Sequence, residues 1–332
     1  MNSFTRKNNT RLYRLPLVVF VIIAGILGFI QFRLPHLQLL LAERFTKGVG
    51  WIEVFVVAGY GAIVMYHMQD PLRTPGWRKM TWFVFTVVFF GQLLLGLTLN
   101  GKFLMTGKLH VPVPALIIAG PLYRGQLSIM TILFLSTILI TGSAWCSQLC
   151  YFGAMDNLMA GRKKSVKTIQ NKGALKATFF MFVVVAALTM RWLHISSVIA
   201  TFLAVGFGAA GLLIMVLLSA KKGKMYHCII YCPVGTFVNY LRYINPFRIK
   251  IDHSCTNCMR CIPYCKYDAL GIQDVRNKKP GITCTLCGDC IAGCRDNSIH
   301  YQFFKINPVQ SRNLYMVLVV SLHAIFMALA RI

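Results

Sequence analysis

The sequence predicts an all-α membrane bundle of about seven transmembrane helices, with one small α+β domain outside the membrane. Three observations support this fold class. Hydrophobic residues make up 56% of the 332 residues and charged residues 13%, whereas soluble domains carry about 25% charged residues. Seven stretches without a charged side chain are long enough, or nearly so, to cross a bilayer. Eight of the twelve cysteines lie together in residues 255–294, outside these stretches. An ordinary soluble enzyme is therefore excluded.

The predicted spans follow from length, because a spanning helix needs about 20 mostly apolar residues. The charge-free stretches are residues 15–32, 54–69, 80–101, 125–155, 177–190, 192–220 and 313–330. The fifth stretch is short, but Lys176 and Arg191 at its ends can extend their charged groups to the membrane surface. We interpret the first stretch as an anchor rather than a signal peptide, because no small-residue cleavage site follows it.

Basic residues predict the orientation of the bundle. With the N-terminus inside, the inner segments hold 27 Lys and Arg and the outer segments hold 8, and cytoplasmic loops are the ones enriched in these residues. We therefore expect a multi-pass protein of a bacterial-type inner (cytoplasmic) membrane, with a cytoplasmic N-terminus and a periplasmic C-terminus. This placement accounts for the net charge of +26 by contact with the lipid bilayer, without a nucleic-acid partner.

Three regions are expected along the chain. Residues 1–246 form a transmembrane helical domain with two C-x3-C motifs, residues 247–304 form the small α+β domain, and residues 305–332 form the last transmembrane helix. The middle region holds five of the nine acidic residues, which is consistent with exposure to water on the cytoplasmic side. The loop of residues 100–126 contains an apolar segment bracketed by prolines, and it predicts a surface or re-entrant loop.

The middle region contains two cysteine runs with the spacing C-x2-C-x2-C-x3-C, which is typical of bacterial ferredoxins with two 4Fe-4S clusters. In such a pair, three cysteines of each run bind one cluster and the fourth binds the other. Cluster 1 is therefore assigned to Cys255, Cys258, Cys261 and Cys294, and cluster 2 to Cys284, Cys287, Cys290 and Cys265. A zinc site built from C-x2-C pairs is the alternative, but it does not explain eight cysteines in two matching runs. Lys266 and Arg295 follow the runs in place of the usual proline, and a positive charge there should raise the reduction potential.

The other four cysteines form an internal repeat, in which residues 146–157 match residues 228–239. Cys146, Cys150, Cys228 and Cys232 coincide in register, as do one glycine and one asparagine of each copy. Cysteines at i and i+4 share one face of a helix, so two such faces could bring four thiols together. Four thiolates suit a soft metal or an iron–sulfur cluster. A redox-active dithiol remains an alternative, and so does simple packing of cysteine as a small apolar residue.

Taken together, these motifs resemble those of a known family of membrane proteins. The two C-x3-C pairs, the Pro233 that follows the second, several spans and the double ferredoxin run resemble the NapH/NosR group of membrane ferredoxins over about residues 80–304. In that group both pairs are followed by proline, whereas Tyr151 follows the first pair here. The resemblance implies electron transfer linked to quinol, and a periplasmic redox partner that carries flavin, haem or iron–sulfur. Another branch resembles copper-handling assembly factors, which implies reduction of metal ions.

Glu53 is a further candidate, because it lies just inside the second span on the outer side. Acidic side chains within a membrane are costly and often functional, so Glu53 could accept a quinol proton; an interfacial residue that faces headgroups is the alternative. His67 and His323 lie in spans, but a lone helical histidine is more often packed than bound to haem. No phosphate-binding or dinucleotide-binding glycine motif occurs.

The function predicted from these features is that of an oxidoreductase subunit of quinol-dehydrogenase type. It would use two 4Fe-4S clusters, a third metal or iron–sulfur site at the C-x3-C motifs, and quinone. Electrons would pass between the quinone pool or a cytoplasmic donor and a periplasmic partner. The alternatives are a copper reductase or assembly factor, which would hold copper at the C-x3-C thiols, and a membrane redox sensor.

The orientation leads to a direct prediction. A reporter fused after Ile332 should be active outside the cytoplasm, and one fused at Met1 should be active inside, because an odd number of spans separates the two termini. Paired alkaline phosphatase and fluorescent-protein fusions measure this. Both reporters on one side would contradict the seven-span arrangement, most directly at residues 177–190.

Overall fold

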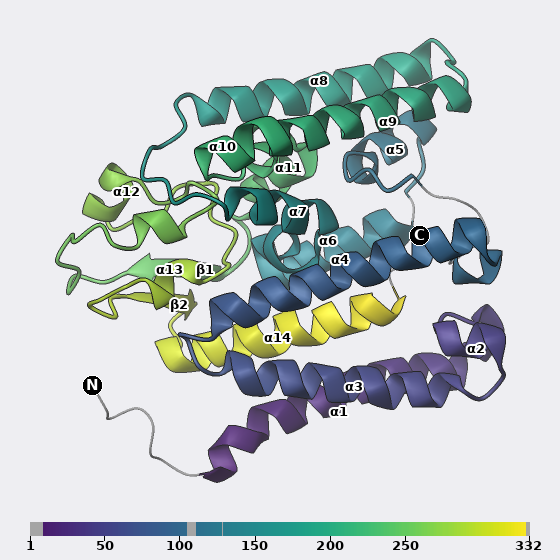
Figure 1. Ribbon diagram of the computed structural model, residues 1–332, viewed down its shortest axis with the longest axis horizontal. Helices are drawn as coiled ribbons and strands as arrows, with labels where there is room; N and C mark the ends of the chain where they lie inside the picture. Colours follow the sequence, from purple (N-terminus) through teal and green to yellow (C-terminus); the bar gives the residue numbers. More distant parts are fainter. Residues whose placement is uncertain (1–8, 105–110, 128, 330–332) are drawn as a thin grey trace. The chain divides into compact units, whose positions relative to one another are not determined.

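The computed structural model describes residues 9–104, 111–127 and 129–329 and is mostly helical (Figure 1). Seven of the described helices are long and apolar enough to cross a membrane, so the predicted number of spans is confirmed. These helices are Tyr13–Arg33, Gly50–Met68, Thr74–Thr98, Thr131–Leu149, Lys172–Trp192, Ser197–Lys222 and Pro308–Leu329. A multi-pass membrane protein follows from their length and composition.

The chain divides into two compact units, one within Met1–His110 and Arg312–Ile332 and the other within Val111–Ser311. The predicted boundaries after residues 246 and 304 separate regions of different composition, and they remain a prediction. All twelve cysteines lie in the second unit.

The first unit is a bundle of apolar helices. It contains α1 (Asn9–Arg33), α2 (Leu41–Phe45), α3 (Gly50–Met68), α4 (Thr74–Thr98) and most of α14 (Pro308–Leu329). Gly61 of α3 lies against Ile23 of α1 and Ala324 of α14, so the absence of a side chain lets these helices approach closely. His323 is buried and lies 3.1 Å from the hydroxyl of Tyr60, in agreement with a packed histidine.

In the second unit, the longest charge-free stretch is broken rather than continuous. Helix α6 (Ile129–Thr141) ends at Gly142, whose positive φ of 65° favours glycine. A 3-10 turn (Gly142–Ala144), a π-helical turn (Trp145–Leu149) and α7 (Tyr151–Ala160) follow. The Asn245 side chain lies where a Cβ on Gly142 would be and donates to the Leu139 carbonyl at 3.0 Å, which satisfies a backbone group freed by the break.

The sixth span leads into a segment that doubles back. Helix α9 (Ser197–Ile214) continues through a π-helical turn (Met215–Ser219) and α10 (Ala220–Lys222) to Gly223, where φ is 71°. A second π-helical turn (His227–Tyr231) then runs back along α9, since His227 lies against Gly211 and the Tyr231 hydroxyl donates to the Phe207 carbonyl at 2.9 Å. Helix α11 (Pro233–Leu241) follows.

The Tyr231 ring also stacks on Phe207 of α9 and contacts Phe179 of α8 (Lys172–Trp192). The returning segment is therefore packed between α8 and α9, rather than exposed at the end of a span. Consequently the second C-x3-C motif is held inside the helical part of this unit.

The apolar loop before α6 is re-entrant. Helix α5 (Leu116–Arg124) has its beginning close to the middle of α9, because the Val113 side chain lies against Gly208. Its other end reaches the turn between α8 and α9, where the Tyr123 hydroxyl donates to the Ile195 carbonyl at 2.6 Å. Of the two alternatives predicted for residues 100–126, the described part, which leaves out residues 105–110, matches the re-entrant one.

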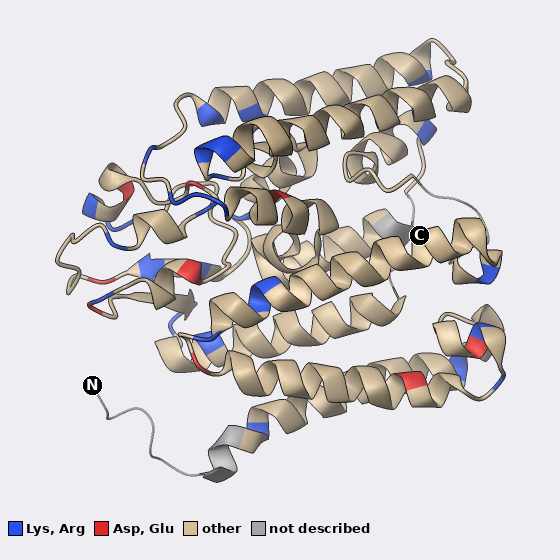
Figure 2. Ribbon diagram, viewed as in Figure 1, with Lys and Arg blue, Asp and Glu red and all other residues tan. Residues whose placement is uncertain are grey.

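Residues 247–304, the cluster segment, contain one antiparallel pair of strands in the described chain. Strands β1 (Phe247–Ile251) and β2 (Ile299–Phe303) pair from Phe247 with Phe303 to Ile251 with Ile299. Between them lie α12 (Ile272–Arg276) and α13 (Asp289–Ala292). Figure 1 shows this segment at the end of the second unit opposite α5, and Figure 2 shows Lys and Arg gathered around that end.

The close contact at Gly61 predicts a stability effect. A Gly61→Leu substitution should lower the free energy of unfolding by about 1–3 kcal/mol, because the new side chain overpacks the contact with Ile23. Gly59→Leu is the matched control on the same helix, since a Cβ there meets nothing within 4 Å. Thermal unfolding of the detergent-solubilised proteins compares the two, and equal destabilisation would contradict the prediction.

Candidate functional site

The fold brings the eight cysteines of the cluster segment into two groups. Burial, followed by the neighbouring thiols of Cys294, Cys255 and Cys258, raises the pKa of Cys261 to about 11. These four are the cysteines assigned to cluster 1. Cys258 is exposed, so this group lies at the surface.

The second group is more deeply enclosed. Cys265, Cys284 and Cys290 are buried. Burial raises the pKa of Cys290 well above its usual value, and the thiols of Cys287, Cys265 and Cys284 act in the same direction. The grouping is that expected from the spacing, with Cys265 joining the second run. The role of each cysteine as a ligand remains a prediction.

The two C-x3-C copies share one local geometry, which differs from the helical face predicted for i and i+4. In each copy the first cysteine lies in a π-helical turn and the second ends it in an extended conformation, with φ and ψ of −78° and 114° at Cys150 and −72° and 117° at Cys232. The amides of Cys150 and Cys232 donate five residues back, to Trp145 and His227. Such π-helical turns are frequent at functional sites.

Each second cysteine is also the N-cap of the next helix. Backbone N–H groups of Phe152 and Gly153 point to the Cys150 thiol, and those of Val234 and Gly235 point to the Cys232 thiol. The first residue of each helix is Tyr151 or Pro233. The N–H group of the first residue of a helix has no partner within the helix, so a proline, which lacks this group, loses no bond there. Tyr151 can therefore replace proline in the first copy, and the two helix starts keep the same geometry.

All four thiols converge into what we call the four-cysteine site (Cys146, Cys150, Cys228 and Cys232). The charges of Cys146, Cys150 and Cys232 each act on Cys228. Burial, followed by the charge of Cys232, raises the pKa of Cys150 to about 12, against the lowering effect of the Gly153 and Phe152 amides. Burial thus disfavours the thiolate form of Cys150 and Cys228 unless a cation stabilises it.

Two charged side chains near the four-cysteine site were not identified from the sequence. Asp156 is fully buried and accepts a hydrogen bond from the Cys228 amide at 3.0 Å. Burial raises its pKa to about 6, against hydrogen bonds from Ser219 and Cys228. Lys176 is only 4% exposed, so the prediction that it extends to the membrane surface is wrong. The only sequence signal for Asp156 was an acid in a charge-poor repeat.

The cluster segment is docked directly on the first C-x3-C copy. The Ser143 hydroxyl donates to the Cys284 carbonyl at 3.0 Å, and the Ser147 hydroxyl donates to the Thr285 carbonyl at 2.9 Å. In return, the Tyr267 hydroxyl donates to the Cys146 carbonyl at 2.6 Å. The loop that carries a cluster 2 cysteine therefore lies against the four-cysteine site.

A small cavity lies between the cluster segment and the four-cysteine site. It is lined by Cys146, Cys228, Lys176, Ile229, Gly235, Asn239, Tyr267, Thr283 and Thr285. Its volume of about 10 Å³ is close to the space that one water molecule needs. It is too small for a quinone ring.

Charged contacts fasten the cluster segment to the helices. The Lys224 ammonium is buried, donates to the Cys265 carbonyl at 2.8 Å and lies 3.4 Å from Asp268. Lys172 pairs with the same carboxylate at 3.0 Å. Lys266 donates to the carbonyls of Ala160 and Gly223 at 3.1 and 3.2 Å, so this residue, expected to tune a cluster, also anchors the segment.

The donor set of the described cysteines fits iron–sulfur clusters. Within the described residues, no group of three or more His, Cys, Asp or Glu side chains is close enough to hold a metal ion. Thiolates around one zinc ion lie within about 4 Å of one another, given a Zn–S length of about 2.3 Å. A cluster with several irons holds its thiolates farther apart, and all twelve donors here are cysteine thiols.

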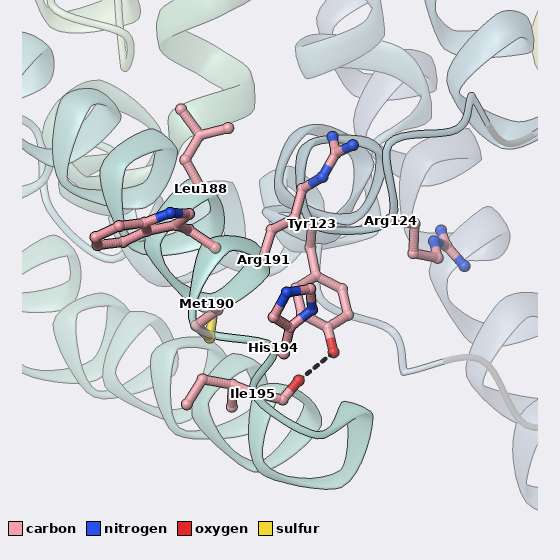
Figure 3. A pocket seen from close by; sticks show the side chains of 8 residues that line it. Tyr123, Arg124, Leu188, Met190, Arg191, His194 and Ile195 are labelled. Carbon is pink, nitrogen blue, oxygen red and sulfur yellow. Dashed lines mark hydrogen bonds between the residues drawn. The ribbon is translucent and has the colours of Figure 1, made fainter.

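A larger hollow than this cavity lies elsewhere in the described part of the chain. Figure 3 shows it at the end of α8 that faces α5, lined among others by Tyr123, Arg124, Arg191 and His194. It measures about 600 Å³. Leu188 on its wall is twelve residues along α8 from Lys176, which corresponds to about 18 Å. The hollow is therefore separate from the four-cysteine site.

Glu53 lies in the first unit, which contains no cysteine. Its carboxylate accepts a hydrogen bond from the Ala42 amide at 2.8 Å, at the start of α2, and its charge acts on Arg44. These contacts give Glu53 a structural role, and its role as a proton acceptor remains a prediction.

A protein-family model described as "4Fe-4S binding domain" matches residues 126–168 and 202–252. The chain is an iron–sulfur protein. The matched segments contain both C-x3-C copies and end before Cys255. The similarity therefore falls on the four-cysteine site and its helices, rather than on the ferredoxin runs.

Two relatives are proteins of Methanocaldococcus jannaschii that bear the name uncharacterized protein. MJ0749 is 24% identical over 178 residues, which cover 51% of this chain and 68% of the relative. MJ0750 is 22% identical over 195 residues, which cover 54% of this chain and 80% of the relative. No solved structure matches the chain.

The grouping of the cluster segment predicts unequal effects of a single substitution. Cys258→Ser should remove the cluster 1 signal from the electron paramagnetic resonance spectrum of the reduced protein and lower the iron content by about four atoms per chain. Cluster 2 should persist, because Cys258 belongs to the exposed group. Loss of both signals in equal measure would contradict the assignment.

Proposed function

We propose that the protein is a membrane electron carrier in which electrons pass between cluster 1, cluster 2 and a third iron–sulfur centre held by the four-cysteine site. The observation that carries this proposal is the docking of the cluster segment. The Cys284 carbonyl accepts the Ser143 hydroxyl, and the Cys146 carbonyl accepts the Tyr267 hydroxyl. A ligand of cluster 2 and a ligand of the third centre thus lie in segments joined by direct hydrogen bonds.

The order of the centres follows from exposure. Cluster 1 includes the exposed Cys258, whereas cluster 2 includes the buried Cys265, Cys284 and Cys290. An external donor or acceptor in water reaches cluster 1 first, and cluster 2 faces the helices. The third centre then receives or supplies electrons inside the helical part.

Support for a third centre comes from the thiols themselves. Burial raises the pKa of the Cys150 and Cys228 thiols, so their charged thiolate forms need a positive group to stabilise them. An iron–sulfur core supplies that charge, and the match to a 4Fe-4S binding domain lies on these segments. Iron–sulfur chemistry supplies one-electron transfer, while this chain's residues orient the thiols, exclude water and hold the neighbouring cluster in place.

For the physiological role, we propose a quinol-dehydrogenase type of subunit, as the resemblance to the NapH/NosR group implies. Quinone would exchange electrons with the membrane part, and a periplasmic partner would complete the path. The multi-pass character of the chain supports a membrane-soluble reactant. Glu53 remains the proposed proton acceptor for quinol.

Iron analysis tests the third centre. The intact protein should contain more iron than the about eight atoms of two 4Fe-4S clusters. Cys150→Ser and Cys232→Ser should each lower the content to about eight, because each removes an N-cap thiolate from the same site. Both variants should also lose electron transfer from reduced clusters 1 and 2 to a water-insoluble quinone analogue.

Ser136→Ala is a suitable control, because its exposed hydroxyl bonds only within α6, to the Leu133 carbonyl. It should keep both the iron and the transfer rate. An iron content of about eight in the unsubstituted protein, with no effect of Cys232→Ser on transfer, would overturn the proposal.

A further inference from the structure

The side chain with the least expected position is Lys176. It lies one turn into α8, a helix apolar enough to span a membrane, and is 4% exposed. A buried ammonium is costly unless it is paired. It therefore needs an electrostatic partner inside the second unit.

The partners are three thiols of the four-cysteine site, those of Cys146, Cys228 and Cys232. Lys176 lines the small cavity together with Cys146 and Cys228, and its charge interacts with those of Cys146, Cys232 and Cys228. The position is fixed by its own backbone, since the Thr236 hydroxyl of α11 donates to the Lys176 carbonyl at 3.4 Å. Cys232 is the N-cap of helix α11, so the lysine and this thiol are held on adjoining elements.

Neighbouring charges have other partners. Lys172, one turn earlier on α8, pairs with Asp268 at 3.0 Å, and Lys224 lies 3.4 Å from the other oxygen of Asp268. Asp156 accepts a hydrogen bond from the Cys228 amide and adds negative charge near that thiol. The field of Lys176 thus offsets negative charge contributed by both the thiolates and Asp156.

We infer that Lys176 is a positioning charge for the third centre, one that raises its reduction potential and so makes it a good acceptor of electrons from cluster 2. The inference rests on the proposed third centre. A reduced iron–sulfur centre carries one more negative charge than the oxidised one, so a fixed cation nearby stabilises the reduced form more. In a water-poor site this effect is weakly screened.

The test is a redox titration of the full-length protein in detergent, followed by electron paramagnetic resonance. Lys176→Met, which keeps the length but removes the charge, should shift the midpoint potential of the third centre to more negative values. Lys176→Gln should shift it the same way. Lys176→Arg should leave it near that of the unsubstituted protein, and the potentials of clusters 1 and 2 should change less than that of the third centre in every variant.

Lys222→Met is the matched control, because it removes one charge from an exposed position at the end of the sixth span. It should leave all midpoints unchanged. A third-centre midpoint that is the same in Lys176→Met and the unsubstituted protein would overturn the inference while leaving the proposed function intact. A third signal missing from the unsubstituted protein would instead overturn the proposed function and the inference together.

Assembly of the centre provides a second criterion. Loss of third-centre iron in Lys176→Met and Lys176→Gln, with retention in Lys176→Arg, would support a requirement for positive charge. Loss in all three variants, with clusters 1 and 2 kept, would show that side-chain shape matters and would overturn the role of the charge.

Discussion

The contact between the Cys284–Thr285 backbone and the broken end of the fourth span is the interaction on which the proposed electron path depends. Ser143 and Ser147 present buried hydroxyls to two consecutive carbonyls of a cluster loop. Tyr267 completes the contact from the other side through the Cys146 carbonyl. Since buried polar groups lose free energy when left unpaired, these bonds fix one orientation of the cluster segment, with cluster 2 facing the helices.

The helix breaks make that contact possible. A continuous α-helix would use its own carbonyls and amides, and would leave neither the Cys146 carbonyl free for Tyr267 nor amides free for the Cys150 thiol. The π-helical turn and the following N-cap release these groups, and the second copy repeats the arrangement at Cys232. The repeat therefore duplicates a thiol-binding helix end, as well as a cysteine spacing.

Basic side chains of the second unit lie where they can stabilise negatively charged groups, thiolates included, in an apolar environment. Lys224 and Lys172 hold the carboxylate of Asp268 at the edge of the cluster segment, and Lys266 fastens the same edge to backbone carbonyls. Lys176 lies deeper and faces the four-cysteine site. Basic residues of the kind that topology rules assign to a cytoplasmic surface thus also contact the cysteine-bearing segments. None of these four lysines lines the large hollow at the other end of α8.

The sequence by itself determined the seven apolar spans, the two cysteine runs and the C-x3-C repeat, because hydropathy and spacing are local properties that survive any tertiary arrangement. The assignment of the cluster-segment cysteines to two clusters remains a prediction from their spacing. The sequence could not place Lys176, because a lysine near a helix end looks the same whether it reaches water or a buried thiol. Only the tertiary structure decided that the second C-x3-C copy doubles back between α8 and α9, and that the loop of Cys284 docks against the first copy. These outcomes depend on contacts between segments that are distant in the sequence, such as Tyr231 with Phe179 and Ser143 with Cys284, and no local pattern encodes such a pairing.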